Sequence, residues 1–117
     1  MPAGTKIGYG NTFTAKRSMT ITVLPVGYWE GYDRHLSNRG IVLIKNKKCP
    51  VVGRICMNLM MVDVSNVRSV KAGENVILIG QEGREAITAE DLAEKIGTIN
   101  YEVVTRINPV LSRVVVK

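Results

Sequence analysis

The strongest constraint on the fold is a succession of short β-branched runs separated by turn residues. Thr20–Val26 and Gly40–Ile44 are two such runs. Repeated runs of this length with turns between them are typical of β-barrels and β-sandwiches, so we expect a mostly β, small β-barrel-like domain of about seven or eight strands. The candidate strands are Thr20–Val26, Gly40–Ile44, Cys49–Ile55, Met60–Val64, Asn75–Ile79, Glu102–Ile107 and Arg113–Val116. Turns are expected at Asn46–Lys47, Lys71–Glu74 and Gln81–Arg84.

One short helix is predicted near residues 88–97. Thr88 is a suitable N-cap, and Asp91 three residues later completes a capping box. An apolar stripe of Leu92, Ala93 and Ile96 follows, and Gly97 suits the left-handed residue that ends a helix. The polar pair Asn100–Tyr101 would then lie at a helix-to-strand junction on the surface.

Length and composition indicate a single globular domain over residues 1–117. The chain is 45% hydrophobic and 22% charged, which is ordinary for a folded protein. Its net charge of +6 would suit nucleic acid, an anionic membrane surface or an acidic protein. The cations are dispersed, however, and Phe13 is the only Phe, whereas nucleic-acid modules cluster cations with stacking aromatics. We therefore expect no nucleic-acid partner.

The cysteines and the single histidine do not predict a metal site. Cys49 and Cys56 lack a CxxC spacing, and His35 is the only histidine. Two thiols fit a reducing cytosol, and no apolar run approaches the roughly 20 residues that span a bilayer. A cytoplasmic protein without membrane contact is expected. Residues 1–4 lead straight into a motif, which resembles a cut inside a longer polypeptide.

No complete catalytic constellation is present in the sequence. There is no Ser/His/Asp set, no P-loop and no dinucleotide-binding glycine motif. What remains is a group of hydroxyls and polar groups in expected loops, which resembles one wall of a site whose other wall is missing. Its members are Tyr9, Tyr28, Tyr32, Arg54, Met57, Asn58 and Tyr101.

The order of several motifs resembles the C-terminal β domain of alanine racemases. The segments Val51–Met57 (VVGRICM) and Ile99–Glu102 (INYE) are the most specific, and the similarity covers nearly the whole chain. The remaining segments, in the family's order and spacing, are Tyr9–Gly10, Leu24–Tyr28, Gly31, Leu36–Gly40, Val62–Asp63 and Arg113.

This resemblance implies a racemase that uses pyridoxal phosphate, bound as a Schiff base to a lysine of an N-terminal (β/α)8 barrel. The barrel is absent from this chain. Racemisation needs an acid–base group on each face of a planar intermediate, and in the family the second group is the tyrosine that matches Tyr9. That residue reaches into the active site of the partner subunit of a homodimer. The alternative for Tyr9 is an ordinary surface-turn residue.

The resemblance assigns further roles with less weight. Tyr101 matches a residue that contacts the cofactor phosphate, although it could simply pack at a helix end. Met57 matches a residue whose backbone N–H binds the substrate carboxylate, while its side chain would more often fill a core. Tyr28 and Arg54 match residues of the substrate entrance, and a structural ion pair is an equal alternative for Arg54.

Asn58 departs from the family pattern, which has aspartate after the RxCM segment. An amide donates as well as accepts hydrogen bonds, so Asn58 could receive the hydroxyl of serine. Serine racemases of vancomycin-resistance systems resemble alanine racemases, carry Asn here and have a membrane-embedded N-terminal region. Neutral drift in an alanine racemase is the alternative. The parent protein could therefore be membrane-anchored.

These observations predict a domain that supplies Tyr9 to a racemase acting on alanine, serine or both, for peptidoglycan synthesis. The isolated chain should be inactive, because it lacks the cofactor lysine and the phosphate-binding barrel loops. The alternatives are a basic β-barrel interaction module that binds nucleic acid or an acidic protein, and a standalone dimerisation domain.

Overall fold

The computed structural model describes residues 2–7, 13–112 and 114–115. Over these residues the chain forms nine strands, a 3₁₀ turn and two α-helices. In chain order they are β1 Lys6–Ile7, β2 Phe13–Thr14, β3 Ile21–Leu24, η2 Arg34–Leu36, β4 Ile41–Ile44, β5 Lys47–Val52, β6 Met60–Asp63, β7 Val76–Ile77, β8 Gly80–Glu82, β9 Glu85–Ile87, α1 Ala89–Ile96 and α2 Asn100–Thr105. The expected mostly β architecture is confirmed.

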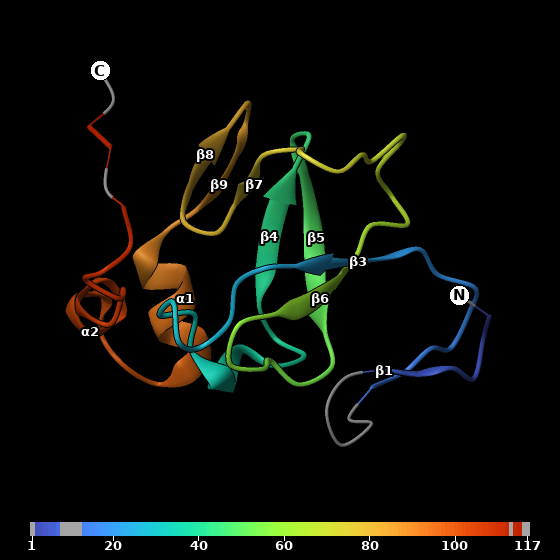
Figure 1. Ribbon diagram of the computed structural model, residues 1–117, viewed down its shortest axis with the longest axis horizontal. Helices are drawn as coiled ribbons and strands as arrows, with labels where there is room; N and C mark the ends of the chain where they lie inside the picture. The colour runs from blue at the N-terminus through green and yellow to red at the C-terminus, as the bar shows by residue number, and fades with distance from the viewer. Residues whose placement is uncertain (1, 8–12, 113, 116–117) are drawn as a thin grey trace.

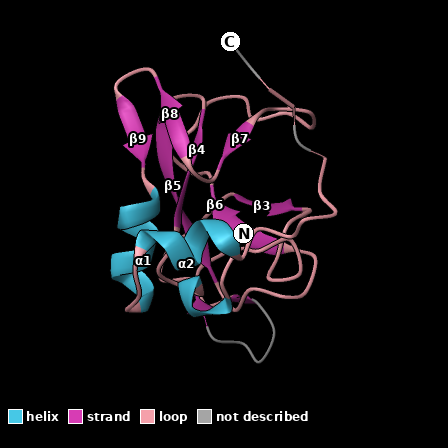
Figure 2. Ribbon diagram, turned by 90° about the vertical axis from the view of Figure 1, so that its left-hand side faces the viewer, coloured by secondary structure: helices cyan, strands magenta, loops and turns pink. Residues whose placement is uncertain are grey.

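A curled five-stranded antiparallel sheet forms the body of the domain, with strand order β3-β6-β5-β4-β7. The hairpins β1–β2 and β8–β9 form two further small sheets. Figure 1 shows α1 and α2 at one end of the long dimension and the β1–β2 hairpin at the other. Figure 2 shows the two helices side by side against the lower part of the sheet. The extents are 40 × 29 × 24 Å.

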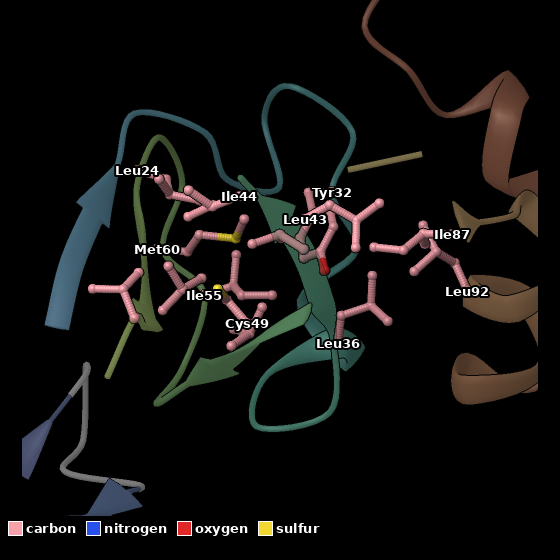
Figure 3. Packing of buried hydrophobic residues seen from close by; sticks show 14 of the residues in the cluster. Leu24, Tyr32, Leu36, Leu43, Ile44, Cys49, Ile55, Met60, Ile87 and Leu92 are labelled. Atoms are coloured by element: carbon pink, nitrogen blue, oxygen red, sulfur yellow. The ribbon is translucent and has the colours of Figure 1, made fainter. Parts of the chain in front are cut away.

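The core lies between the curled sheet and the helices. Leu36, Leu43, Ile44, Ile55 and Met60 are all less than 2% exposed. Figure 3 shows these side chains gathered inside the sheet, with Ile87 and Leu92 extending the core toward α1. Full burial of an aliphatic side chain contributes about 1.5–3 kcal/mol, so this cluster is the main source of stability.

The predicted helix near 88–97 is confirmed as α1. The Thr88 hydroxyl accepts the Asp91 N–H at 3.0 Å, and the Asp91 carboxylate accepts the Thr88 N–H at 2.9 Å. Gly97 ends the helix with φ of 75°, in the left-handed region that favours glycine. Local capping chemistry therefore specifies both ends of α1.

The predicted strand at Glu102–Ile107 is wrong, because residues 100–105 form a second helix, α2. Its β-branched residues suggested a strand, but only Val103 is buried, so the alternating burial of a strand is absent. Contacts with neighbouring helical turns stabilise the helix instead. Asn100 donates to Glu90 of α1 at 2.8 Å, and Arg106 pairs with Glu102 one turn earlier.

The predicted strand at Arg113–Val116 does not form in its described part. Val114 and Val115 have no regular structure and are exposed, while residues 113 and 116 lie outside the described residues. Asn100 and Tyr101 accordingly begin α2 rather than joining a helix to a strand.

Five other predicted runs overlap the strands of the large sheet, with shifted ends. β5 begins at Lys47, two residues before the predicted Cys49, because Lys45 and Asn46 both adopt positive φ in a tight hairpin turn. The turn predicted at Gln81–Arg84 is confirmed at Gly83, with φ of 61°, and Arg84, whereas Gln81 and Glu82 belong to β8. The strands of both short hairpins were missed because strands of two or three residues leave no periodic signal.

Gly40 and Tyr32 give a test of core packing. A methyl group at Gly40 would collide with the Tyr32 hydroxyl and lie 3.1 Å from Val51 Cγ2. We expect Gly40→Ala to lower the free energy of unfolding by about 1–3 kcal/mol through overpacking.

The Tyr32 hydroxyl is buried and has no hydrogen-bond partner among the described residues. Tyr32→Phe should therefore be neutral or stabilising, and it should recover part of the loss in the double variant. Urea unfolding of the three variants measures this. If the double variant Gly40→Ala/Tyr32→Phe lost as much free energy of unfolding as Gly40→Ala alone, the proposed collision with the Tyr32 hydroxyl would be contradicted.

Candidate functional site

Two loops build the candidate site, residues 25–33 after β3 and residues 53–59 between β5 and β6. Their backbones are hydrogen-bonded: the Tyr28 N–H donates to Cys56 O at 3.1 Å and the Trp29 N–H to Met57 O at 2.9 Å. Gly27 makes this approach possible, because a Cβ there would collide with the Cys56 carbonyl and lie 2.6 Å from the Met57 carbonyl oxygen. Backbone contact thus fixes the two loops against each other.

A groove of about 480 Å³ opens where these loops meet η2. It brings together three of the predicted residues, Tyr28, Arg54 and Met57. Tyr28 and Met57 are 44% and 52% exposed. The complete lining is Tyr28, Arg34, Arg54, Ile55, Cys56 and Met57.

Two guanidinium groups give the groove a positive charge. Arg34 and Arg54 both line it, and together with His35 and Ser37 they line an adjoining hollow of about 270 Å³. Neither guanidinium forms an ion pair with any described residue. The alternative of a structural ion pair for Arg54 is therefore not seen. Arg34 was not a predicted site residue. It is distant from Arg54 in sequence, so no sequence signal indicated that the two residues line the same groove.

An ionic cluster holds η2 and α2 in place beside the groove. Asp33 accepts the His35 N–H at 2.7 Å and its ring Nδ1–H at 2.8 Å, and pairs with Arg106 Nη1 at 2.6 Å. Burial alone would raise the pKa of Asp33, but the hydrogen bonds from His35 and the charges of His35 and Arg106 outweigh it. The pKa of Asp33 therefore lies below its ordinary value, and its carboxylate stays charged at neutral pH.

The backbone of Met57 is open to a ligand. Its carbonyl is used by Trp29, whereas its N–H makes no hydrogen bond within the described part of the chain. Because the side chain is 52% exposed, the alternative role of Met57 as a core filler is wrong. A free N–H beside two unpaired guanidinium groups can bind a small carboxylate through charge-assisted hydrogen bonds.

Asn58 lies next to the groove without lining it. Its amide Nδ2 donates to Glu30 Oε2 at 3.0 Å, while Glu30 Oε1 accepts the Gly27 N–H at 2.7 Å. Glu30 thereby links both loops. The sequence did not identify this role for Glu30, since the residue lies in a turn far from Asn58 along the chain.

Tyr101 and Tyr9 are not brought to the groove by the described structure. Tyr101 lies in the first turn of α2, does not line the groove and is 71% exposed. That exposure argues against the alternative of helix-end packing. Tyr9 lies outside the described residues, between β1 and β2.

Other site classes find little support among the described residues. No group of three His, Cys, Asp or Glu side chains there could hold a metal ion. Over the same residues no helix combines the length and apolar character needed to cross a membrane. Cys49 and Cys56 are free thiols, and burial together with the nearby Asp63 charge raises the pKa of Cys49.

Comparison with known proteins identifies the family of this chain. A family model described as "Alanine racemase, C-terminal domain" matches residues 1–115. The alanine racemase of Leptospira interrogans serovar copenhageni is 49% identical over 115 residues, covering 98% of this chain and 30% of that protein. That of Halothermothrix orenii is 48% identical over 108 residues, covering 92% and 28%. This chain thus spans about a third of the length of these relatives.

Solved structures agree with this assignment. The alanine racemase from E. faecalis superposes with a TM-score of 0.85 at 38% identity, over 92% of this chain and 28% of that one. The enzyme from Bartonella henselae with covalently bound pyridoxal phosphate gives 0.83 at 31% identity, over 92% and 29%. With the family model matching nearly the full length, the chain belongs to the alanine racemase C-terminal domain family.

Proposed function

We propose that this chain is the C-terminal domain of a longer pyridoxal-phosphate-dependent racemase, called the parent racemase below, which interconverts L- and D-alanine. Family membership and the coverage of about a third of the relatives support this. The observation that carries it is the groove. There the unpaired Arg34 and Arg54 and the free Met57 N–H suit a small substrate that bears a carboxylate.

The residues of this domain can supply a small part of the contacts that would hold the cofactor. The Tyr101 hydroxyl is exposed at the start of α2 and can donate to a phosphate oxygen, and the remaining contacts would come from the barrel. When bound, pyridoxal phosphate supplies the electron sink that makes the substrate Cα–H acidic. This domain's own residues orient the substrate and move a proton.

Tyr9 is proposed as the proton-transfer group on one face of the substrate, in the active site of the partner subunit of a homodimer. Its flanking strands β1 and β2 stand at the end of the domain away from α1 and α2 (Figure 1). A free phenol has a pKa near 10, so neighbouring cations must lower it for base chemistry at neutral pH. Arg17 is already paired with Asp63, so we do not assign it that role.

Alanine is the preferred substrate in this proposal. Asn58 gave the reason to consider serine, but the residue has a partner within its own chain. An aspartate there would face the Glu30 carboxylate, so the amide is explained by Glu30 alone. D-alanine made in the cytoplasm would supply peptidoglycan synthesis. The membrane-anchored serine racemase of vancomycin resistance is therefore the lesser candidate.

The first prediction concerns Tyr9. In the parent racemase, Tyr9→Phe should lower kcat by about 10²–10⁴-fold, the usual contribution of a general acid–base, with little change in KM. Chiral chromatography of alanine measures turnover in both directions.

Tyr32→Phe is the matched control, because it removes a buried phenol hydroxyl outside the groove and should leave kcat unchanged. The 117-residue chain alone, mixed with pyridoxal phosphate and L-alanine, should form no D-alanine above blank. Full activity of the Tyr9→Phe enzyme would exclude the proposed role.

The second prediction concerns Asn58→Asp, which places a second carboxylate beside Glu30. Repulsion raises the pKa of the introduced carboxyl above its unfolded value, so the variant is less stable at pH 7 and recovers as pH falls below about 4. The exposed site limits the loss to about 1 kcal/mol or less. Thermal unfolding of the chain at both pH values measures it.

The same variant tests the substrate in the parent racemase. If Glu30 alone accounts for Asn58, the ratio of kcat/KM for serine to that for alanine should stay within about twofold. A fall of tenfold or more would instead mean that the amide binds the serine hydroxyl. Asn66→Asp, at an exposed position away from the groove, is the control.

A further inference from the structure

Asp63, at the end of β6, is a buried carboxylate that the groove does not use. It is 8% exposed and is the buried charged residue of the described chain. Burying a carboxylate is costly unless hydrogen bonds and an opposite charge compensate. The contacts of the Asp63 carboxylate therefore indicate which structural role offsets the cost of burying it.

One carboxylate oxygen is bound within the end of its own strand. Asp63 Oδ1 accepts the Ser65 N–H at 2.9 Å and the Ser65 hydroxyl at 2.5 Å. The same hydroxyl oxygen accepts the Thr20 N–H at 3.0 Å, and the Val64 N–H donates to Thr20 O at 2.8 Å. Thr20, the residue before β3, is thereby held to the end of β6, and the carboxylate is fixed in orientation.

The other oxygen faces a cation that belongs to a different part of the fold. Asp63 Oδ2 pairs with Arg17 Nη2 at 3.4 Å. Arg17 lies three residues after the end of β2 and two residues after Ala15. Ala15 closes the base of the β1–β2 hairpin, because its N–H donates to Thr5 O at 2.8 Å and its carbonyl accepts the Gly4 N–H at 2.6 Å.

The described strands of the hairpin are not paired with the body of the domain, and an apolar cluster links their base to it. β1 and β2 pair with each other and, among the described strands, with no strand of the five-stranded sheet. Behind Ala15, a small apolar cluster with Met19 and Val52 contacts the sheet, separate from the main core. Figure 1 shows strand β1 at the end of the domain opposite α1 and α2. The Arg17–Asp63 ion pair thus links the base of the β1–β2 hairpin to the end of β6.

We infer that Asp63, Ser65 and Arg17 form a positioning set that fixes the direction in which the β1–β2 hairpin leaves the sheet. The apolar cluster supplies attraction without direction, whereas the oriented carboxylate restricts where Arg17 can lie. Residue 9 lies between the two strands of this hairpin. The consequence for catalysis rests on the proposed function of Tyr9. The role of the Arg17–Asp63 ion pair in holding the hairpin does not depend on that proposal.

The first test measures how strongly the Arg17–Asp63 ion pair holds the base of the hairpin in the 117-residue chain. Hydrogen exchange followed by NMR should show the amides of Gly4 and Ala15 exchanging about tenfold faster in Arg17→Met, because local opening becomes easier. The core amides of Val42 and Val62 should keep their wild-type rates. Arg84→Met is the matched control, since Arg84 lies in the exposed β8–β9 turn and forms no ion pair with the described residues.

Arg17→Lys should recover most of the protection, and Asp63→Asn should reproduce Arg17→Met. If Asp63→Asn does not fold, the Arg17 variants decide alone, because the Arg17 side chain is 61% exposed. Unchanged exchange of Gly4 and Ala15 in Arg17→Met would overturn the inference.

The second test separates positioning from mere stability in the parent racemase. Arg17→Met should lower kcat about tenfold with KM unchanged, Arg17→Lys should recover it, and Arg84→Met should have no effect. A loosened hairpin with full kcat would overturn the positioning role. If Tyr9→Phe itself left the enzyme active, the proposed function would fail. The hydrogen-exchange result would still decide whether the Arg17–Asp63 ion pair holds the hairpin.

Discussion

The close approach of the two groove loops is the constraint on which the candidate site depends. It requires a residue without a side chain at Gly27, and it is secured by backbone hydrogen bonds from Tyr28 and Trp29 to the 53–59 loop. Glu30 ties the same loops from the other side by accepting from Gly27 and Asn58. Because backbone atoms form most of this junction, it holds a free N–H and exposed side chains in fixed places without burying them.

Charged groups in this domain have two separate uses. In the cluster of Asp33, His35 and Arg106 and in the pair of Asp63 and Arg17, the partly buried Asp33 carboxylate and the buried Asp63 carboxylate are bound by backbone and side-chain donors. These pairs connect elements distant in sequence. Arg34 and Arg54, at the groove, instead form no ion pair with any residue that the structure describes. A net positive chain can therefore use some cations for structure and keep others for an anionic ligand, and its charge alone does not indicate nucleic acid.

Elements that carry their own local chemistry were predictable. The capping box of Thr88 and Asp91 with Gly97 gave both ends of α1, and apolar runs located the strands of the large sheet. The segment Glu102–Ile107 was mistaken for a strand because its β-branched composition carries no information about Glu90 and the other neighbours that make the helix α2 favourable. Tertiary contacts overrode a weak local preference.

The motifs of the sequence by themselves determined the family, the mostly β class and the candidates Tyr28, Arg54 and Met57, because each depends on residue identity in a fixed order. Only the tertiary structure decided that these three share a groove, that Arg34 joins them, and that Tyr101 stands apart on α2. The reason is physical. Proximity between loops separated by two strands, β4 and β5, follows from sheet pairing and from the space that glycine leaves at residue 27, neither of which a single segment encodes.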